Sequence, residues 1–372
     1  MPQVLFLGVF LLMLFGSHLF IFRSLAGFLG IAGVYRIWLG IAIAVLPVLF
    51  IISSLVAHYF FNYFTRALYF VSGLWLAFAL NLIVAFCAVW LVSGASKFSN
   101  ISLNLKYFGW LGIILSFLYL IYGIYNAYDI KVKNITVKIK DLPIEWQNKK
   151  AVQISDVHLG YVYGKDHLQS LVDRVNGLDP DIVFITGDLF DGMDGHLDEL
   201  VDPIDQLHPA LGTYFITGNH EIYLGVDKAF ETLRKTNVKI LDDAFVNLGG
   251  VQVAGISFPG GGISEGRDFA GVFGSFKGFD PAKPVVLLYH SPTQIAQAKD
   301  LGVDLFLAGH THVGQLFPLE LITHFVYQGF DYGFHEDGDL SVYTSSGVGT
   351  WGPTARTSKN SEITLINFQV KK

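Results

Sequence analysis

The first 128 residues of this 372-residue chain contain no aspartate or glutamate, although the whole chain has 31 acidic residues. The same region holds only five basic residues, which are Arg23, Arg36, Arg66, Lys97 and Lys106. Charged residues make up 15% of the chain, against roughly 25% in an average soluble domain. We therefore expect two regions that face different solvents, residues 1–128 and residues 129–372.

Several other features are scarce or missing. Cys87 is the single cysteine and falls in an apolar stretch, so it gives no evidence for or against an oxidising compartment. The chain has no Gly-X4-Gly-Lys-Ser/Thr loop, and a nucleotide-triphosphate motor is therefore not indicated. Residues 129–372 carry 20 basic against 31 acidic side chains, a formal charge of −11. Such a domain is not expected to bind nucleic-acid backbones tightly without bound cations.

The N-terminal region is rich in apolar sequence. Each of its four charge-free stretches reaches the ~20 residues that a helix needs to span a bilayer. They are Val4–Phe22, Ile37–Val56, Ala67–Val92 and Phe108–Tyr128. The first could instead be a signal peptide, but it lacks a basic n-region and is longer than a usual h-region. We expect four transmembrane helices in a multi-pass membrane protein.

The distribution of basic residues bears on orientation. Four spans place both ends of the region on one side of the membrane. The short loops on the side opposite the C-terminal region hold four basic residues, and the short loop on its own side holds one, Arg66. Because the loops richer in Lys and Arg usually face the cytoplasm, this count places the C-terminal region outside it. Including Lys131, Lys133, Lys138 and Lys140 changes the count to four against five, and the rule no longer decides. The expectation of an extracytoplasmic domain rests on the shorter count.

The C-terminal region is expected to fold as layered strands and helices. Ile182–Thr186 is a short run of β-branched and aromatic residues, which is typical of a strand covered on both faces in an α/β fold. Other predicted strands are Ile135–Lys140, Ala151–Ser155, Gly212–Thr217, Pro284–Tyr289, Asp304–Ala308, Leu340–Thr344 and Ile363–Phe368, with further strand sequence in Val238–Ile256. Predicted helices are Asp166–Leu178, Leu197–Leu207 and Val226–Thr236.

Five of these strands end abruptly in polar residues. The residues at their ends are Asp156 and His158, then Asp188, then Asn219 and His220, then His290, and finally His310 and His312. Ligands and catalytic groups gather at the carboxyl ends of strands in such folds. Any one of these signals is weak alone, and Gly-His-Thr-His is the strongest because two imidazoles so close together have little packing rationale. The five in this order predict a common site.

The residue types indicate which ions such a site would hold. Imidazole, carboxylate and amide ligands suit Mn, Fe, Zn or Ni, and we favour Mn. The strand-end residues other than His220 give seven candidate ligands, which are too many for one four-coordinate ion. Two divalent ions that share a bridging carboxylate would use the ligands economically.

The five motifs resemble those of the calcineurin-like metallophosphoesterase superfamily, over roughly Lys149–Phe368. The tail from Gly349 through Pro353 and Arg356 is also similar to the membrane-associated bacterial branch with N-terminal transmembrane helices. The resemblance implies a mixed α/β (α+β) fold in which a two-sheet β-sandwich is flanked by helices to give four layers. In this sequence that fold would occupy residues 129–372.

The resemblance also implies a role for each site residue. One metal would be held by Asp156, His158, Asp188 and His312, and the other by Asp188, Asn219, His290 and His310. Asp188 would bridge the two ions. His220 would act on the substrate or leaving group as a general acid, and Asp191 would orient it.

These observations together predict a membrane-anchored hydrolase that cleaves a phosphoester or pyrophosphate by metal-activated water. A substrate at the bilayer surface, such as a phospholipid head group or a lipid-linked sugar pyrophosphate, would explain the anchor. The alternative is a membrane receptor or transport component whose metal-binding domain does not turn over. That alternative would be expected to lose a ligand or His220, and the sequence retains all of them.

Overall fold

The computed structural model of the protein describes residues 2–60, 62–193, 197–260 and 266–371. The chain divides into two compact units. Met1–Tyr125 and Gly352–Thr357 form one, called here the helical unit, and Asn126–Trp351 and Ser358–Lys372 form the other, the sheet unit. A short piece of the C-terminal tail therefore belongs with the N-terminal helices.

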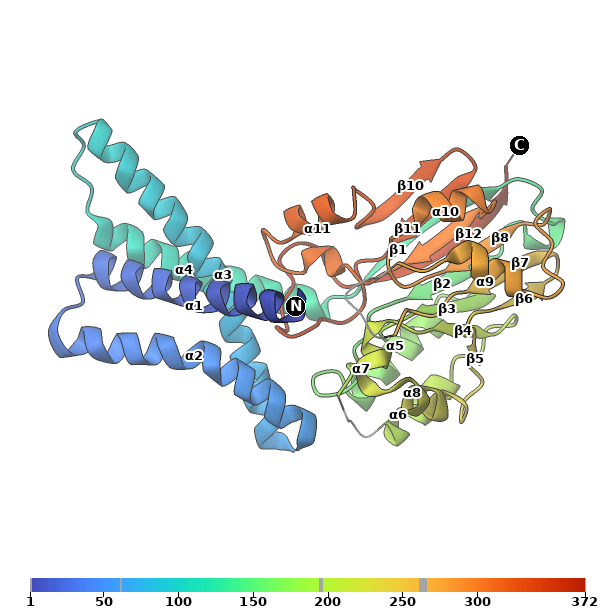
Figure 1. The fold of residues 1–372 in the computed structure, drawn as a ribbon, viewed down its shortest axis with the longest axis horizontal. Helices are drawn as coiled ribbons and strands as arrows, with labels where there is room; N and C mark the ends of the chain where they lie inside the picture. Colours follow the sequence, from blue (N-terminus) through green and yellow to red (C-terminus); the bar gives the residue numbers. More distant parts are fainter. Residues whose placement is uncertain (1, 61, 194–196, 261–265, 372) are drawn as a thin grey trace. The chain divides into compact units, whose positions relative to one another are not determined.

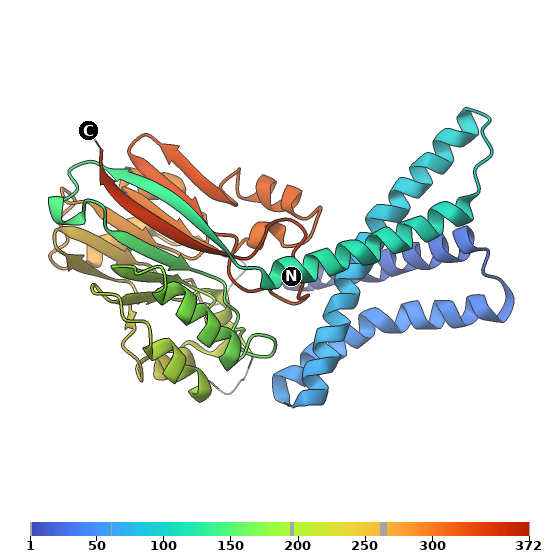
Figure 2. The ribbon, with the colours of Figure 1, turned by 180° about the vertical axis from the view of Figure 1, so that it is seen from behind.

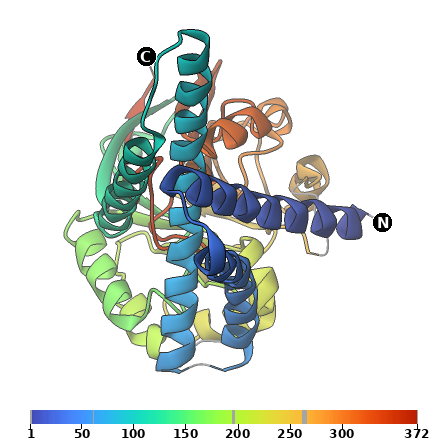
Figure 3. The same cartoon turned by 90° about the vertical axis from the view of Figure 1, so that its left-hand side faces the viewer.

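The helical unit contains four long apolar helices, which Figure 3 shows from the left of Figure 1. They are α1 (Pro2–Leu29), α2 (Gly33–Tyr59), α3 (Tyr63–Phe98) and α4 (Leu105–Tyr128). All four are long and apolar enough to cross a membrane. They extend beyond the predicted stretches because a single basic residue near an end, such as Arg23 or Arg66, does not interrupt the backbone hydrogen bonding of a helix.

Polar side chains inside the helical unit bond between helices. Trp75 Nε1 donates to His18 Nε2 at 3.0 Å, and Trp90 Nε1 donates to Ser24 Oγ at 3.0 Å. Asn81 donates from Nδ2 to the backbone carbonyl of Ser116 at 3.3 Å. Bonds of this kind satisfy polar groups in an apolar environment, so His18 and Asn81 have a structural explanation.

The tail segment Gly352–Thr357 packs within the helical unit on α4. The backbone N–H of Arg356 donates to the carbonyl of Gly123 at 2.8 Å, and the Tyr119 hydroxyl donates to the carbonyl of Thr357 at 3.0 Å. A Cβ added at Gly123 would lie 2.8 Å from Thr357 Cγ2, so a larger residue there would push the segment away. Contacts between the tail and α4 were not among the sequence-based predictions.

The sheet unit is built on two sheets, each with six strands among the described residues (Figures 1 and 2). The first has the order β1-β12-β2-β3-β4-β5, with β1 (Lys131–Ile139), β12 (Glu362–Val370), β2 (Lys150–Ile154), β3 (Ile182–Thr186), β4 (Thr213–Ile216) and β5 (Lys239–Ile240). The second has the order β10-β11-β9-β8-β7-β6, with β10 (Gly333–Asp337), β11 (Leu340–Thr344), β9 (Leu305–Ala308), β8 (Val285–Leu288), β7 (Val251–Gly255) and β6 (Ala244–Leu248). Strands β2 to β5 run parallel, as do β7, β8, β9 and β11.

The two sheets pack face to face with helices on their outer faces. Apolar residues of both sheets, including Phe184, Ile216, Val253 and Leu305, form one buried cluster between them. The outer face of the first sheet is covered by α5 (Lys165–Asn176), α6 (Asp198–Asp205) and α8 (Val226–Leu233), and that of the second by α9 (Phe269–Ser275) and α10 (Ile295–Asp300). The predicted four-layer α/β architecture is confirmed.

Strand β3 has the predicted bounds and shows why the prediction worked. Val183 and Ile185 belong to the cluster under the helices, whereas Ile182 and Phe184 belong to the cluster between the sheets. All four side chains are fully buried. A strand with both faces covered needs apolar residues at every position, and that continuous run is visible in the sequence.

Short elements at the strand ends complete the unit. They are η1 (Ile144–Trp146), α7 (Asn219–Leu224), η2 (His312–Gly314) and α11 (Glu320–Val326). Two of them carry predicted site residues, since α7 begins with Asn219 and His220 and η2 begins with His312.

Candidate metal centre

The five predicted strand ends are the carboxyl ends of β2, β3, β4, β8 and β9. In the first sheet β2, β3 and β4 are parallel neighbours, and in the second β8 and β9 are parallel neighbours. Parallel neighbours deliver the loops that follow them to the same edge of a sheet. The sandwich therefore brings residues that are far apart in the sequence into contact, such as His158 and His312, which are separated by 154 positions.

One cluster consists of Asp156, His158 and His312, with one ligand atom of each within 4.8 Å of the others. His158 Nε2 lies 2.9 Å from His312 Nε2, which lies 3.4 Å from Asp156 Oδ1. All three side chains are buried. Ring nitrogens and a carboxylate oxygen that converge in this way form a donor set for a cation.

A second cluster consists of Asp188, His290 and His310, with one ligand atom of each again within 4.8 Å of the others. His290 Nε2 lies 3.1 Å from Asp188 Oδ2 and 3.2 Å from His310 Nδ1. His290 Nδ1 lies 2.7 Å from the carbonyl of Thr186, to which it donates. This bond turns Nε2 toward the cluster, so Nε2 carries the lone pair whenever the imidazole is neutral, as it would be when it binds a cation.

Asn219 provides a direct test of whether a metal fits. Its side-chain Oδ1 is buried and has no hydrogen-bond partner among the described residues. A buried polar atom without a partner is costly, and a cation would satisfy it. Together with the oxygen and nitrogen donors of the two clusters, this atom fits divalent ions of the Mn, Fe, Zn or Ni type.

The pKa shifts in the second cluster also favour a bound cation. Burial alone would lower the pKa of His290, but the Asp188 and Asp156 carboxylates raise it to about 10. Burial would raise the pKa of Asp188, yet the neighbouring imidazoles hold it well below its usual range. The buried carboxylates thus need positive charge beside them, which a bound cation would supply.

Backbone conformation is strained at five of the predicted ligands. Positive φ angles between 47° and 71° occur at Asp156, His158, Asp188, His310 and His312. Residues with a side chain rarely adopt this left-handed region, and each instance costs of order 1–3 kcal/mol. Strain of this kind persists where the surroundings impose it, and it clusters at functional sites.

A third group places His220 beside Asp191 and His158. His220 Nδ1 donates to the backbone carbonyl of Asp191 at 2.7 Å, whereas the Asp191 carboxylate lies 4.0 Å away. Burial raises the pKa of that carboxyl to about 7. The sequence identified Asp191 by its carboxylate, but the closer contact comes from its main chain, which leaves His220 Nε2 as the nitrogen free to exchange a proton.

Glu221 has a role in the site that the sequence did not reveal. Its buried carboxylate accepts from the N–H groups of Asp188 at 3.0 Å, Phe190 at 3.0 Å and Gly218 at 2.7 Å. It thereby joins the loop after β3 to the loop after β4. Glu221 follows His220 directly, and that adjacency was the only signal of its importance.

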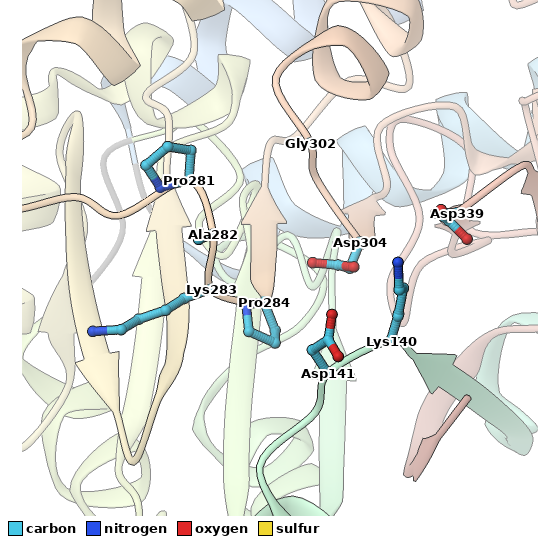
Figure 4. A pocket seen from close by; sticks show the side chains of 9 residues that line it. All are labelled: Lys140, Asp141, Pro281, Ala282, Lys283, Pro284, Gly302, Asp304 and Asp339. Carbon is cyan, nitrogen blue, oxygen red and sulfur yellow. The ribbon is translucent and has the colours of Figure 1, made fainter. Parts of the chain in front are cut away.

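A separate pocket of about 110 Å³ lies at the other ends of the strands (Figure 4). Its lining includes Asp141 after β1, Pro284 before β8 and Asp304 before β9. None of the predicted site residues lines it. Asp304 there accepts a bond from the N–H of Val285 at 2.8 Å, a structural role, and the pocket is distinct from the metal centre.

The layered fold and the two clusters of possible metal ligands describe a candidate metal-binding domain, and comparisons with known proteins identify its family. Residues 149–314 match the calcineurin-like phosphoesterase family. An uncharacterized metallophosphoesterase of Campylobacter jejuni is 35% identical over 267 residues, which cover 70% of each chain. An uncharacterized metallophosphoesterase of Aquifex aeolicus is 32% identical over 67% of this chain and 96% of its own.

The name of one vertebrate relative mentions both a transmembrane protein and a metallophosphoesterase domain. A Danio rerio protein described as a transmembrane protein with a metallophosphoesterase domain is 33% identical over 69% of this chain and 61% of its own. The chain belongs to the calcineurin-like metallophosphoesterases. The family implies divalent metal ions and a phosphoester substrate.

The contacts of Glu221 lead to a prediction about stability and metal binding. In Glu221→Gln the side-chain nitrogen would face backbone N–H groups, so one or more buried donors would lose their acceptor. We expect the free energy of unfolding to fall by about 1–3 kcal/mol and metal affinity to fall with it. Thermal unfolding in detergent and metal titration would measure both. Glu231→Gln, at an exposed position of α8, is the control and should change neither; equal effects of the two substitutions would refute the role of Glu221.

Proposed function

We propose that the chain is a membrane-anchored phosphoesterase that depends on two divalent ions and hydrolyses a phosphoester or pyrophosphate bond by direct attack of water. The observation that carries the proposal is the pair of buried ligand clusters with His220 beside them. Membership of the metallophosphoesterase family supports hydrolysis as the reaction class.

In this proposal one ion is held by Asp156, His158, Asp188 and His312, and the other by Asp188, Asn219, His290 and His310. The bridging position of Asp188 is supported by its contacts on both sides. Its backbone carbonyl accepts from the N–H of His158 at 3.1 Å, and its carboxylate faces His290. The proposed ligands are nitrogen and oxygen atoms only, which suits each of the candidate ions, and among these we propose Mn.

Two bound divalent ions would activate water and polarise the phosphoryl oxygens. The chain itself supplies orientation and proton transfer. Because Nδ1 of His220 is engaged by the Asp191 carbonyl, Nε2 is the atom that can donate a proton to the leaving-group oxygen. The buried surroundings of the clusters limit the water that could compete for the charges.

The apolar helices indicate where the proposed enzyme would meet its substrate. Residues 1–128 would anchor the protein, and residues 129–372 would form the catalytic domain. The segment Gly352–Thr357 of the second region packs within the helical unit. An enzyme held in a bilayer meets substrates presented at the bilayer surface, so we propose a lipid or lipid-linked phosphoester. We also propose that the catalytic domain lies outside the cytoplasm, which the count of basic residues in the short loops supports.

The first prediction from this proposal concerns turnover. The full chain in detergent with Mn²⁺ should hydrolyse a generic aryl phosphodiester, and His220→Ala should lower kcat by about 10²- to 10⁴-fold, the usual contribution of a general acid. Both ions should remain bound in this variant, as metal analysis would show. If the unmodified chain binds metal but hydrolyses no monoester, diester or lipid pyrophosphate, the result would favour the receptor alternative.

A second prediction concerns the bridging carboxylate. Asp188→Asn should weaken both metal sites together, whereas His312→Ala should weaken mainly one. Titration calorimetry and metal analysis of the purified chain would give the two affinities. His208→Ala, an exposed histidine outside the clusters, serves as the control. If the Asp188→Asn protein kept two ions and full turnover, the bridging role would have to be abandoned.

A third prediction concerns orientation. In a chain with Cys87 replaced by alanine and exposed Lys359 replaced by cysteine, a membrane-impermeant thiol reagent should label intact cells. The expected labelling follows from the short-loop count, which places the domain that contains residue 359 outside. Protection in intact cells, with labelling only after the membrane is broken, would reverse the orientation.

A further inference from the structure

Helix α11 exposes an unusual amount of apolar surface. Among the described residues of the sheet unit, the segment 317–326 has six exposed large apolar side chains, and four more lie elsewhere, at Tyr128, Ile144, Tyr223 and Trp351. The six are Phe317, Leu319, Leu321, Ile322, Phe325 and Val326. Phe325 alone is 85% exposed. Apolar patches of this density mark surfaces that meet another apolar phase.

Helix α11 exposes its apolar side chains, whereas its polar residues Glu320 and Thr323 are half-buried and the His324 ring, although bonded to Asp331, is 71% exposed. Its polar residues bond to the sheet unit, with Thr323 Oγ1 donating to Asp331 Oδ2 at 3.1 Å and His324 Nδ1 lying 3.0 Å from Asp331 Oδ1. Glu320, one helical turn earlier, accepts from Ser358 Oγ at 3.0 Å. These residues occupy one face at helical spacing, and Leu321, Ile322, Phe325 and Val326 occupy the other.

This orientation is fixed by packing close to the metal centre. Asp331 accepts through its backbone carbonyl from Thr311 Oγ1 at 2.6 Å, and Thr311 lies between the ligands His310 and His312. Gly314 of η2 approaches the start of α11 so closely that a Cβ there would overlap the Leu319 backbone. The helix is therefore held rigidly with its apolar face outward, beside the loop that carries two ligands.

The chain itself indicates what the apolar face meets. It carries four helices long and apolar enough to cross a membrane, so a bilayer is the apolar phase at hand. Ser358, which bonds to Glu320 of α11, directly follows Thr357, whose carbonyl accepts from Tyr119 of the candidate span α4. A single peptide bond thus separates a residue bonded to α11 from a residue bonded to a candidate span.

We propose that the outward face of α11, formed by Leu321, Ile322, Phe325 and Val326, inserts into the interfacial layer of the bilayer and docks the catalytic domain on the lipid surface. The inference rests on the proposed membrane anchoring. Interfacial helices bind by burying an apolar face in the boundary between head groups and acyl chains. Insertion would bring the loop that holds His310 and His312 to the membrane surface.

Fluorescence quenching in vesicles tests the proposal with the full chain. Cys87 is replaced by alanine, Phe325 by cysteine, and the thiol is labelled with an environment-sensitive dye. The protein is reconstituted into phosphatidylcholine vesicles with brominated acyl chains, or with iodide on both sides of the membrane. We expect at least a twofold quenching of the dye at position 325 by the brominated lipid and little quenching by iodide.

Two reference positions make the outcomes distinguishable. A dye at Ile144→Cys, which is 73% exposed on η1, should show the opposite pattern. A dye on native Cys87 in α3 should be quenched by brominated lipid if the helices span the membrane. If the dye at 325 behaves like that at 144 while Cys87 is quenched, docking is refuted and anchoring stands. If Cys87 is not quenched by brominated lipid, the anchoring fails and the docking proposal fails with it.

A further variant separates insertion from mere proximity. With the dye at Val326→Cys, the substitutions Ile322→Glu and Phe325→Glu should abolish quenching by brominated lipid. Hydrolysis of a water-soluble aryl phosphodiester in detergent should be unchanged, because neither residue contacts a ligand cluster. A dye at position 325 shielded from both quenchers would mean that protein covers the face, as in a dimer of this chain, and would overturn the proposal.

Discussion

The buried carboxylate of Glu221 is the interaction on which the geometry of the site depends. It accepts from backbone N–H groups on both sides of the gap between the β3 and β4 loops. Asp188 in turn accepts from the N–H of His220 at 2.8 Å. The loop that carries the proposed bridging ligand and the loop that carries Asn219 are therefore locked to each other before any ion binds. A metal site prepared in this way loses little conformational entropy on binding.

Hydrogen bonds also support the strained backbone at the predicted ligands. Asp156, for example, has a positive φ, and its carboxylate accepts from the N–H of His310 at 3.0 Å. His310 is itself strained, so the bond ties a strained residue of one sheet to a strained residue of the other. Two sheets packed through a dry apolar core provide the rigid support that such conformations need. The layers matter to function because they hold these turns in place.

Sequence reasoning succeeded where one physical constraint dominated. Strand β3 could be predicted to its bounds because burial on both faces demands apolar residues at every position. The strand ends could be predicted because polar residues directly after such runs are conspicuous. It made no prediction for α11, because exposed apolar residues resemble buried ones in sequence, and residue identity does not show that Thr323 and His324 bond to Asp331. It also missed the Asp191 carbonyl, since main-chain contacts leave no trace in residue identity.

The C-terminal tail bonds to the loop that follows His312 on both sides of the segment that belongs to the helical unit. Gln315, three residues after His312, bonds through its side chain to the backbone of Trp351 in both directions, at 3.1 and 2.9 Å. Its carbonyl also accepts from the N–H of Ser358 at 3.3 Å. Both ends of the segment Gly352–Thr357 are thus held by one residue of the metal-centre loop, while the segment itself packs on α4. The chain therefore connects the helical unit to the sheet unit through both ends of this segment as well as through the N-terminal connection. A domain joined only by a single linker would lack these hydrogen bonds between the tail and the loop that follows His312.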